Sequence, residues 1–392
     1  MSTPGDHTLV RLRDLARAKE EAWVSLVEEL VGIESPSSVP AAQARVQEVM
    51  ARNLEGLGYQ IRRIGGKATG DVLLALPRKD VRRSPQLLLG HTDTVWPVGT
   101  LGVMPVRREG DRLFGPGVFD MKAGLAQIVL ALQLLLEVGL SPEVPPVVLL
   151  NSDEELGSPE STPSIRRWAA KSCRVFVLEP ALGAEGRLKT SRKASGTFRL
   201  RVIGRSAHAG LDPDRGASAI EELAGDILAL CGLSDPPRGI RVNVGKIRGG
   251  ETSNTVAAEA EAEVDVRVTH REDAARIEAA IRGLEPRLEG CRLEVHGGFV
   301  RPPFERTAGT AALWEEARGL ALRMGIELRE GMAGGSSDGN TTAPIAPTLD
   351  GLGAVGDGAH AAHEHVEVGR SLDRGALLAA LLLAPAPMRP HR

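Results

Sequence analysis

Two kinds of hydrophobic pattern divide the chain. In the first half, short continuous apolar runs at 86–94, 146–155 and 174–180 alternate with helix-like segments. Continuous runs are typical of strands that are covered on both faces, and their alternation with helices is typical of an open α/β sheet. The run at 125–140 has apolar residues at helical spacing, which predicts a well-buried helix that is stopped by Gly139.

From about residue 193 the pattern changes to a strict alternation. In the segment 256–268, small apolar side chains share one face, whereas acidic residues and Arg267 share the other. This period of two predicts strands with one solvated face. Together with helix-like segments at 216–232 and 272–288, it predicts the order β-α-β-β-α-β, a four-stranded sheet with two helices on one side.

Helix and strand alternation returns after about residue 303. A chain of 392 residues is long for a single core, so two domains are expected. We predict an α/β domain made of residues 1–192 and 301–392, with a compact domain inserted at 193–300. The proline-rich end at 384–392 is expected to fray.

Composition and charge exclude several classes of protein. The 48 basic and 51 acidic residues give a net charge of −3, which argues against binding to a nucleic acid. The longest apolar run is too short to cross a bilayer, and the N-terminal segment has no apolar region of the signal-peptide kind. Three widely spaced cysteines build neither a disulfide framework nor a CxxC metal site, so they are expected to be buried thiols. We therefore expect a cytoplasmic protein that binds neither nucleic acid nor membrane.

Candidate metal ligands stand where the apolar runs end. Alone, each has an ordinary explanation: an acidic turn in solvent, a structural histidine, or an aspartate that caps a helix. In an open α/β sheet, however, the carboxyl ends of the strands meet at the ligand-binding edge. Two imidazoles and several carboxylates suit zinc, and they exceed the needs of one tetrahedral ion, whereas two ions that share a carboxylate would use them all. The candidates are His91 with Asp93, Asp120 where the buried helix begins, Glu154 with Glu155, Glu179, and His360 after the last glycine-rich segment.

The ordered motifs carry a resemblance to a known family. The series HTD, GPGVFDMKAG, EE, LEP and GAHxxxE resembles the dinuclear zinc exopeptidases of the carboxypeptidase G and aminoacylase clan. The segments SAHAG, GETSNTV and DVR resemble that clan's lid or dimerisation domain, and GGSSDGN and TLDGLG resemble the carboxypeptidase G branch. The likeness covers residues 86–366. It departs from the pattern at His363 and Asp357, and at Ala194, where relatives tend to have glycine.

The resemblance implies a zinc-exopeptidase-like open mixed sheet flanked by helices, with the inserted domain as a lid. It implies two zinc ions bridged by Asp120, with cobalt or manganese as alternatives. His91 and Glu179 would complete one site, and Glu155 and His360 would complete the other.

Further roles follow from the same resemblance. Asp93 would orient His91, Glu154 would be the general base, and His208 would stabilise the oxyanion. The resemblance also assigns substrate contacts in and beyond the lid, among them an arginine that clamps a free carboxylate. These are Asn254, Arg267, Gly335 in its glycine turn, and Arg301 as the clamp.

Several of these residues have ordinary alternatives. Arg267 also suits the wet face of a strand, and Arg301 before a proline suits an ordinary surface position. His363 and His365 are expected to be solvated or to lie behind the ligands, and Glu364 is expected to support His360.

Three functions are consistent with this pattern. The first is a metallo-carboxypeptidase that removes a C-terminal amino acid from a small peptide or N-acyl compound. The second is an N-acyl amino acid deacylase that uses the same chemistry. The third is a non-catalytic scaffold that kept the fold. The resemblance also leads us to expect a homodimer formed through the lid domain.

Overall fold

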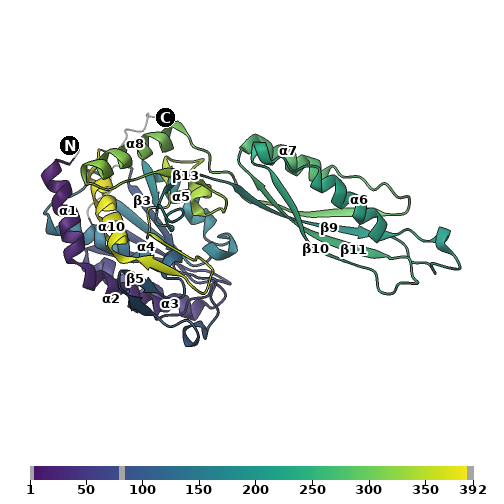
Figure 1. Cartoon of the computed structure of the whole chain (residues 1–392), viewed down its shortest axis with the longest axis horizontal. Helices are drawn as coiled ribbons and strands as arrows, with labels where there is room; N and C mark the ends of the chain where they lie inside the picture. The colour runs from purple at the N-terminus through teal and green to yellow at the C-terminus, as the bar shows by residue number, and fades with distance from the viewer. Residues whose placement is uncertain (1–3, 79–83, 386–392) are drawn as a thin grey trace. The chain divides into compact units, whose positions relative to one another are not determined.

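The computed structural model describes residues 4–78 and 84–385, and it divides the chain into two compact units (Figure 1). The first unit contains the chain up to Ser191, Arg306–Ala333 and the chain from Ser337 onward. The second contains Arg192–Glu305 and Gly334–Ser336. The tail at 384–392 was predicted to fray, and its residues from 386 on lie outside the described part of the chain.

A six-stranded mixed sheet forms the centre of the first unit, so the prediction of an open mixed sheet is confirmed. Its strands follow the order β1-β2-β6-β3-β7-β14, in which β6, β3, β7 and β14 are parallel and β2 is antiparallel to both neighbours. The strands are β1 (Tyr59–Ile64), β2 (Val72–Pro77), β3 (Gln86–His91), β6 (Pro146–Asn151), β7 (Arg174–Val177) and β14 (Thr348–Leu349).

Helices cover both faces of this sheet, which explains the continuous apolar runs. Leu88 packs into the larger apolar cluster on one face, whereas Leu87 and Leu89 pack into a second cluster with helix α5 on the other. The helices of the unit are α1 (Asp6–Ala18), α2 (Glu20–Val31), α3 (Pro40–Gly56), α4 (Ala123–Glu137), α5 (Thr162–Lys171), α8 (Ala308–Arg323), α9 (Asp338–Thr342) and α10 (Val368–Leu383).

Helix α4 is the buried helix that the run at 125–140 predicted. A π-helical turn, Val118–Lys122, precedes it. By length and composition the combined stretch Val118–Glu137 could span a membrane, but 89% of that window is buried inside the protein, as in a core helix. Burial does not extend to every apolar residue of the predicted run, since Leu136 in the last turn is 62% exposed.

Two smaller sheets complete the first unit. One has the order β15-β16-β5-β4, and the other pairs β13 with β8. Their strands are β4 (Arg107–Glu109), β5 (Arg112–Phe114), β8 (Leu188–Arg192), β13 (Glu330–Ala333), β15 (Gly356–Asp357) and β16 (His365–Glu367).

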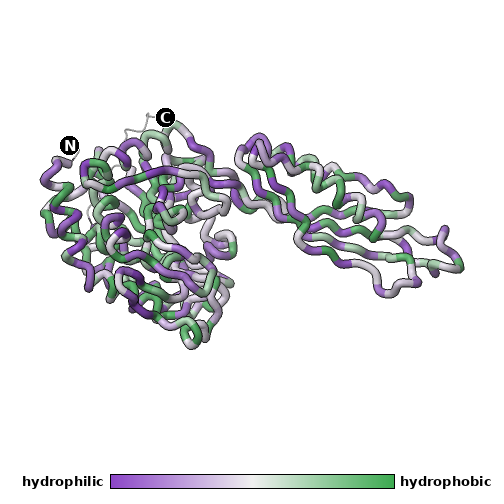
Figure 2. The backbone as a smooth tube through the Cα atoms, in the orientation of Figure 1, coloured by the Kyte–Doolittle hydropathy of each residue, from purple (hydrophilic) through white to green (hydrophobic). Residues whose placement is uncertain are grey.

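The second unit has the predicted order β-α-β-β-α-β. Its antiparallel sheet runs β10-β11-β9-β12, and in Figure 2 hydrophobic and hydrophilic colours alternate along the long strands. Buried and more exposed residues alternate in the same way along β11, so one face carries the apolar core. The elements are β9 (Ala194–Ile203), α6 (Ala219–Cys231), β10 (Arg241–Gly249), β11 (Glu259–Val268), α7 (Arg271–Arg282) and β12 (Arg292–Arg301).

The cysteines are free, but the prediction of three buried thiols is wrong. Cys173 is buried, Cys291 is half-buried and Cys231 is exposed. Cys231 is the last residue of helix α6, where its side chain falls outside the apolar stripe.

Candidate metal centre

Three neighbouring parallel strands deliver candidate ligands to one edge of the central sheet. His91 ends β3 and lies in register with Asn151 at the end of β6, while Leu89 pairs with Val177 at the end of β7. The chain segments that follow these strands, 91–93, 152–155 and 178–180, therefore leave the sheet together. This is the edge at which open α/β sheets bind ligands.

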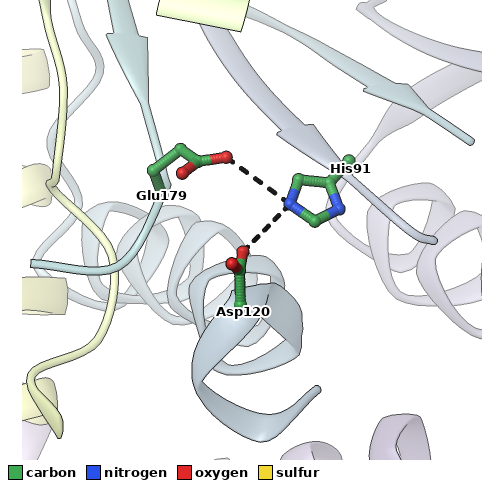
Figure 3. A group of neighbouring side chains, drawn as sticks. All are labelled: His91, Asp120 and Glu179. Carbon is green, nitrogen blue, oxygen red and sulfur yellow. Dashed lines mark hydrogen bonds and ion pairs between the residues drawn. The ribbon is translucent and has the colours of Figure 1, made fainter. Parts of the chain in front are cut away.

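His91 and Glu179 meet Asp120 at this edge (Figure 3). The His91 Nε2 atom lies 3.2 Å from Asp120 Oδ1 and 3.5 Å from Glu179 Oε1. Asp120 reaches them from the π-helical turn in front of α4, where its backbone leaves the helical conformation. It is not the N-cap of α4, which is Lys122, so the capping explanation does not hold for Asp120.

The second oxygen of Asp120 faces a different group. His360 Nε2 lies 3.4 Å from Asp120 Oδ2 and 3.3 Å from Glu155 Oε2. Two sets of three donors therefore share one carboxylate: His91, Asp120 and Glu179, and Asp120, Glu155 and His360. In each set, the donor atoms lie within 4.8 Å of one another. The structure thus brings together all five residues that the sequence proposed as ligands.

Electrostatics favour cations at this place. Burial tends to lower the pKa of the His91 imidazole, yet its contacts with Asp120, Asp93 and Glu179 raise that pKa well above its usual value. Contacts with Asp120 and Glu155 raise the pKa of His360 to about 10. Burial would raise the pKa of Asp120, but the two imidazoles hold it far below its ordinary value. Two protonated imidazoles would offset only part of the charge of the three carboxylates, so the group keeps a negative charge that a bound cation would balance.

The donor set also fits divalent cations chemically. Nitrogen donors from two histidines and oxygen donors from three carboxylates match the ligands of zinc and of similar ions. Within the described chain, the buried Oε1 atom of Glu155 has no hydrogen-bond partner. A buried polar atom of this kind costs free energy unless something binds it, so the geometry leaves a place for a positive ligand.

Asp93 does more than orient His91. The His91 Nδ1 atom contacts the main-chain oxygen of Asp93 at 2.9 Å, which directs Nε2 into the site. The Asp93 carboxylate accepts hydrogen bonds from the backbone amides of Glu154 (3.2 Å) and Glu155 (3.1 Å) and from Ser37 Oγ (2.7 Å). One buried carboxylate therefore fixes both glutamates relative to the imidazole.

The acidic triplet at 153–155 is divided between three tasks. Asp153 accepts the backbone amides of Glu160 (2.7 Å) and Ser161 (3.1 Å), so it organises the start of α5. Glu155 turns to His360, as described above. Glu154 is 8% exposed at the beginning of a 3-10 turn, Glu154–Leu156. The explanation of this segment as a solvated acidic turn is wrong, because all three side chains are largely buried.

Glu364 has a role that the sequence did not reveal. It was expected to support His360, but its buried carboxylate instead accepts the backbone amides of Gly117 (2.8 Å), Phe119 (2.9 Å) and Asp120 (3.0 Å). It also accepts the indole N–H of Trp96 at 2.8 Å. The hydrogen bonds from these donors lower the pKa of Glu364, but burial has the larger effect and raises that pKa to about 7. Glu364 thereby holds the turn from which Asp120 projects.

The other histidines of this segment are not donors to either set. His363 is exposed, and the buried His365 packs against the ring of Phe114 with centroids 5.1 Å apart. A residue missed by the sequence is Lys189 in β8, whose largely buried Nζ lies 3.9 Å from Glu179 Oε2. A single lysine in a short strand gives no signal that would have identified it.

The remaining sequence candidates belong to the second unit. His208 accepts the amides of Gly210 and Leu211 at Nδ1, both at 3.1 Å, and Asn254 is hydrogen-bonded to the same loop through its carbonyl. Arg301 is 4% exposed at the end of β12, so its interpretation as a surface residue is wrong.

Two further candidates have partners inside this unit. Arg267 forms an ion pair with Asp265 on β11, as the wet-face interpretation expects. The carbonyl of Gly335 accepts a hydrogen bond from Arg192 at 3.2 Å.

We predict that Glu364→Gln weakens metal binding by about 10–100-fold, because an amide NH₂ would face backbone donors that position Asp120. Titration of the metal-free protein with zinc against a chromophoric chelator measures this. The matched control is Glu367→Gln, three residues on, where the carboxylate accepts a hydrogen bond from the exposed Arg370 at 3.0 Å. Equal zinc affinity of Glu364→Gln and the wild type would show that Glu364 does not position Asp120.

Comparisons with known proteins agree with this geometry. The chain is 29% identical to carboxypeptidase G2 of Pseudomonas sp. (strain RS-16) over 383 residues, which cover 94% of this chain and 90% of that protein. It is 28% identical to the succinyl-diaminopimelate desuccinylase of Stenotrophomonas maltophilia (strain K279a) over 353 residues, covering 84% and 91%.

Solved structures with the same fold include two peptidases. The aminopeptidase PepT of Bacillus cereus has a TM-score of 0.75 at 21% identity, with 93% of this chain and 98% of that chain covered. An M20 family metallo-carboxypeptidase of Sulfolobus solfataricus has a TM-score of 0.69 at 17% identity, with 92% and 98% covered. Residues 87–384 match the peptidase family M20/M25/M40, and the chain therefore belongs to this family of hydrolases.

Proposed function

We propose that this hydrolase cleaves the amide bond to a C-terminal amino acid of a small peptide or N-acyl compound, as a zinc-dependent carboxypeptidase. The observation that carries the proposal is Asp120, whose two oxygens face two separate donor sets. The similarity to carboxypeptidase G2 over 94% of the chain supports this substrate class.

In this proposal, His91 and Glu179 hold one divalent cation, Glu155 and His360 hold the other, and Asp120 holds both. Such cations, when bound, lower the pKa of water to about 7 and polarise a carbonyl group. The mixed nitrogen and oxygen donors favour zinc, and the same set accepts cobalt or manganese.

Glu154 acts as the general base. It follows Asp153 at the mouth of β6, and its backbone amide is tied to Asp93 beside the two donor sets. Adjacent side chains in a 3-10 turn diverge, so Glu154 and Glu155 can face different partners. Glu154 takes a proton from the attacking water and delivers it to the nitrogen of the leaving amine.

His208 is proposed to stabilise the oxyanion of the tetrahedral intermediate. Because its Nδ1 accepts two backbone amides, the neutral ring carries its hydrogen on Nε2. That tautomer is the hydrogen-bond donor that a developing oxyanion requires. The donor could come from the same chain or from a second subunit.

Recognition of the substrate is assigned to the second unit. Arg301 is proposed to clamp the free carboxylate, since a guanidinium can bind a carboxylate through two parallel hydrogen bonds. Asn254, exposed in the same loop system as His208, is proposed as a further polar contact. Arg267 and the turn at Gly335 are proposed as secondary contacts, which would require Arg267 to exchange its partner Asp265.

The second candidate function is an N-acyl amino acid deacylase. The similarity to a succinyl-diaminopimelate desuccinylase over 84% of the chain favours it, because that name describes removal of an acyl group. The two functions use the same residues for catalysis and differ in what is recognised on the acyl side of the bond.

We also propose a cytoplasmic homodimer that pairs through the second unit. Strand β10 is an edge strand, and apolar side chains are exposed on it and on α6, namely Ile247, Ile220 and Leu228. An exposed edge beside apolar residues is suited to pairing with a second copy. Light scattering should give twice the monomer mass, and a monomer at micromolar concentration would contradict the proposal.

The substrate class is tested with a panel of dipeptides, acyl-glutamates and N-acetyl amino acids, each with a free and an amidated C-terminus. We expect turnover of acyl-glutamates or dipeptides with a free carboxylate, and Arg301→Ala should raise KM for these by about 10–100-fold with a smaller change in kcat. Faster turnover of N-acetyl or N-succinyl amino acids would favour the deacylase. An equal effect of Arg301→Ala on amidated substrates would refute the clamp.

The general base is tested with a pair of adjacent variants. Glu154→Gln should lower kcat by at least about 10²–10⁴-fold while the bound metal, measured by mass spectrometry, stays as in the wild type. Glu155→Gln should lose metal because it removes a ligand. Loss of metal from Glu154→Gln instead would mean that the two roles are exchanged.

A further inference from the structure

A second polar site lies in the first unit, away from the metal-binding residues. It is a cavity of about 380 Å³ bordered by α1, α10, the segment after α8 and the turn around Glu185. None of the five candidate metal ligands lines it. Its wall is unusually rich in arginine, with Arg13, Arg329, Arg370 and Arg374.

Three of these arginines are neutralised by partners. Arg13 binds both oxygens of Asp373, at 3.0 and 2.8 Å. Arg329 pairs with Glu185 at 2.8 Å and with a further glutamate. Arg370 donates to a carboxylate and to the main-chain oxygens of the turn at 184–185. These three side chains therefore build the wall but have no charge left to offer.

Arg374 differs from the other three. It is only 3% exposed, and its Nη1 atom has no hydrogen-bond partner among residues 4–78 and 84–385. The carboxylate of its neighbour, Asp373, is already used by Arg13 and by Arg17, whose two contacts are both 3.1 Å. With Arg17 and with Glu367, the partner of Arg370, included, five arginines share four carboxylates, those of Glu185, Glu327, Glu367 and Asp373, which leaves one positive charge.

A buried guanidinium in this condition is costly for the fold. A charge taken out of water needs a partner and hydrogen bonds to offset its lost hydration, and arginine does not escape by losing its proton at ordinary pH. The cavity is of a size that binds small molecules, since such sites span about 300–1,000 Å³. The partner that this wall lacks is a small anion with two oxygens in one plane.

We propose that the cavity binds a small oxyanion, a carboxylate or a phosphate, through Arg374. Two oxygens of the ligand would accept parallel hydrogen bonds from the guanidinium, and its single negative charge would balance the cavity. By tying α10 to the wall formed by α1 and the segment 325–329, the ligand stabilises the first unit. The proposal is independent of the reaction at the metal centre.

The test uses the full-length, metal-loaded protein and three variants. Sodium acetate, sodium glutarate and inorganic phosphate are compared with sodium chloride at equal ionic strength, by thermal unfolding and calorimetric titration. We expect at least one oxyanion to raise the unfolding temperature of the wild type by about 2–5 °C at tenfold excess over its Kd. The acetate, glutarate and phosphate arms distinguish the carboxylate from the phosphate.

Arg374→Met keeps the approximate volume but removes the charge. It should bind that oxyanion about 10–100-fold more weakly than the wild type. In chloride alone its unfolding temperature should equal or exceed that of the wild type, because the unpaired charge is gone. The matched control is Arg318→Met on α8, which is exposed and pairs with Glu315, and it should behave as the wild type does.

Three results would overturn the proposal. They are no response of the wild type to any of the three oxyanions, the same response in Arg374→Met, or the same loss in Arg318→Met. Should Arg374→Met not fold, Arg374→Lys replaces it, because it keeps the charge but lacks the planar fork. Crystals of the wild type soaked in selenate then give an independent answer: no anomalous peak within hydrogen-bond distance of the Arg374 guanidinium refutes the site.

Discussion

The structure depends on how a cluster of buried carboxylates is kept together. Asp120 lies within 4.8 Å of Glu179 in one donor set and within 4.8 Å of Glu155 in the other, so like charges oppose one another and burial disfavours their ionisation. Only positive charge makes this arrangement stable. The two imidazoles provide positive charge when they are protonated, as the raised pKa of His360 indicates. Divalent cations provide positive charge without any protonation of the imidazoles. Because β6, β3 and β7 are parallel neighbours, their ends lie together. The same arrangement therefore causes the repulsion between carboxylates and forms the candidate metal centre.

A second layer of carboxylates keeps the first in place through backbone amides. Asp93 holds the amides of Glu154 and Glu155, Asp153 holds those at the start of α5, and Glu364 holds the turn that carries Asp120. Each of these acids accepts hydrogen bonds from N–H groups of a loop and so fixes the path of that loop. Donors fixed in this way lose little freedom when a cation binds, which is why second-layer acids matter nearly as much as ligands.

The sequence predicted the fold where its periodicity was clear. Alternation along 256–268 identified β11, and continuous runs identified β3, β6 and β7, because burial on one or two faces leaves a direct trace in residue order. Three of the ligand positions could be proposed for the same reason, because His91 ends β3, Glu155 follows β6 and Glu179 follows β7, whereas Asp120 and His360 were proposed from the motifs around them. What could not be predicted depends on contacts between distant segments. Glu364 binds a loop about 245 positions earlier, and His365 is buried by Phe114, and neither fact is visible in local patterns.

The same physical rule connects the metal centre with the arginine-rich cavity. In a folded chain, buried charges are normally matched by partners within the protein, as Arg13 and Asp373 are. Where a buried charge has no partner of opposite sign, its own sign indicates whether a cation or an anion would bind there. At the edge of the central sheet the remainder is negative, with a buried Glu155 oxygen that lacks a partner in the described chain, and the complement is a cation. Beside α10 the remainder is positive and is concentrated on Arg374, and the complement is an anion. A single accounting of buried charge therefore leads to both sites, although only the first left a motif in the sequence.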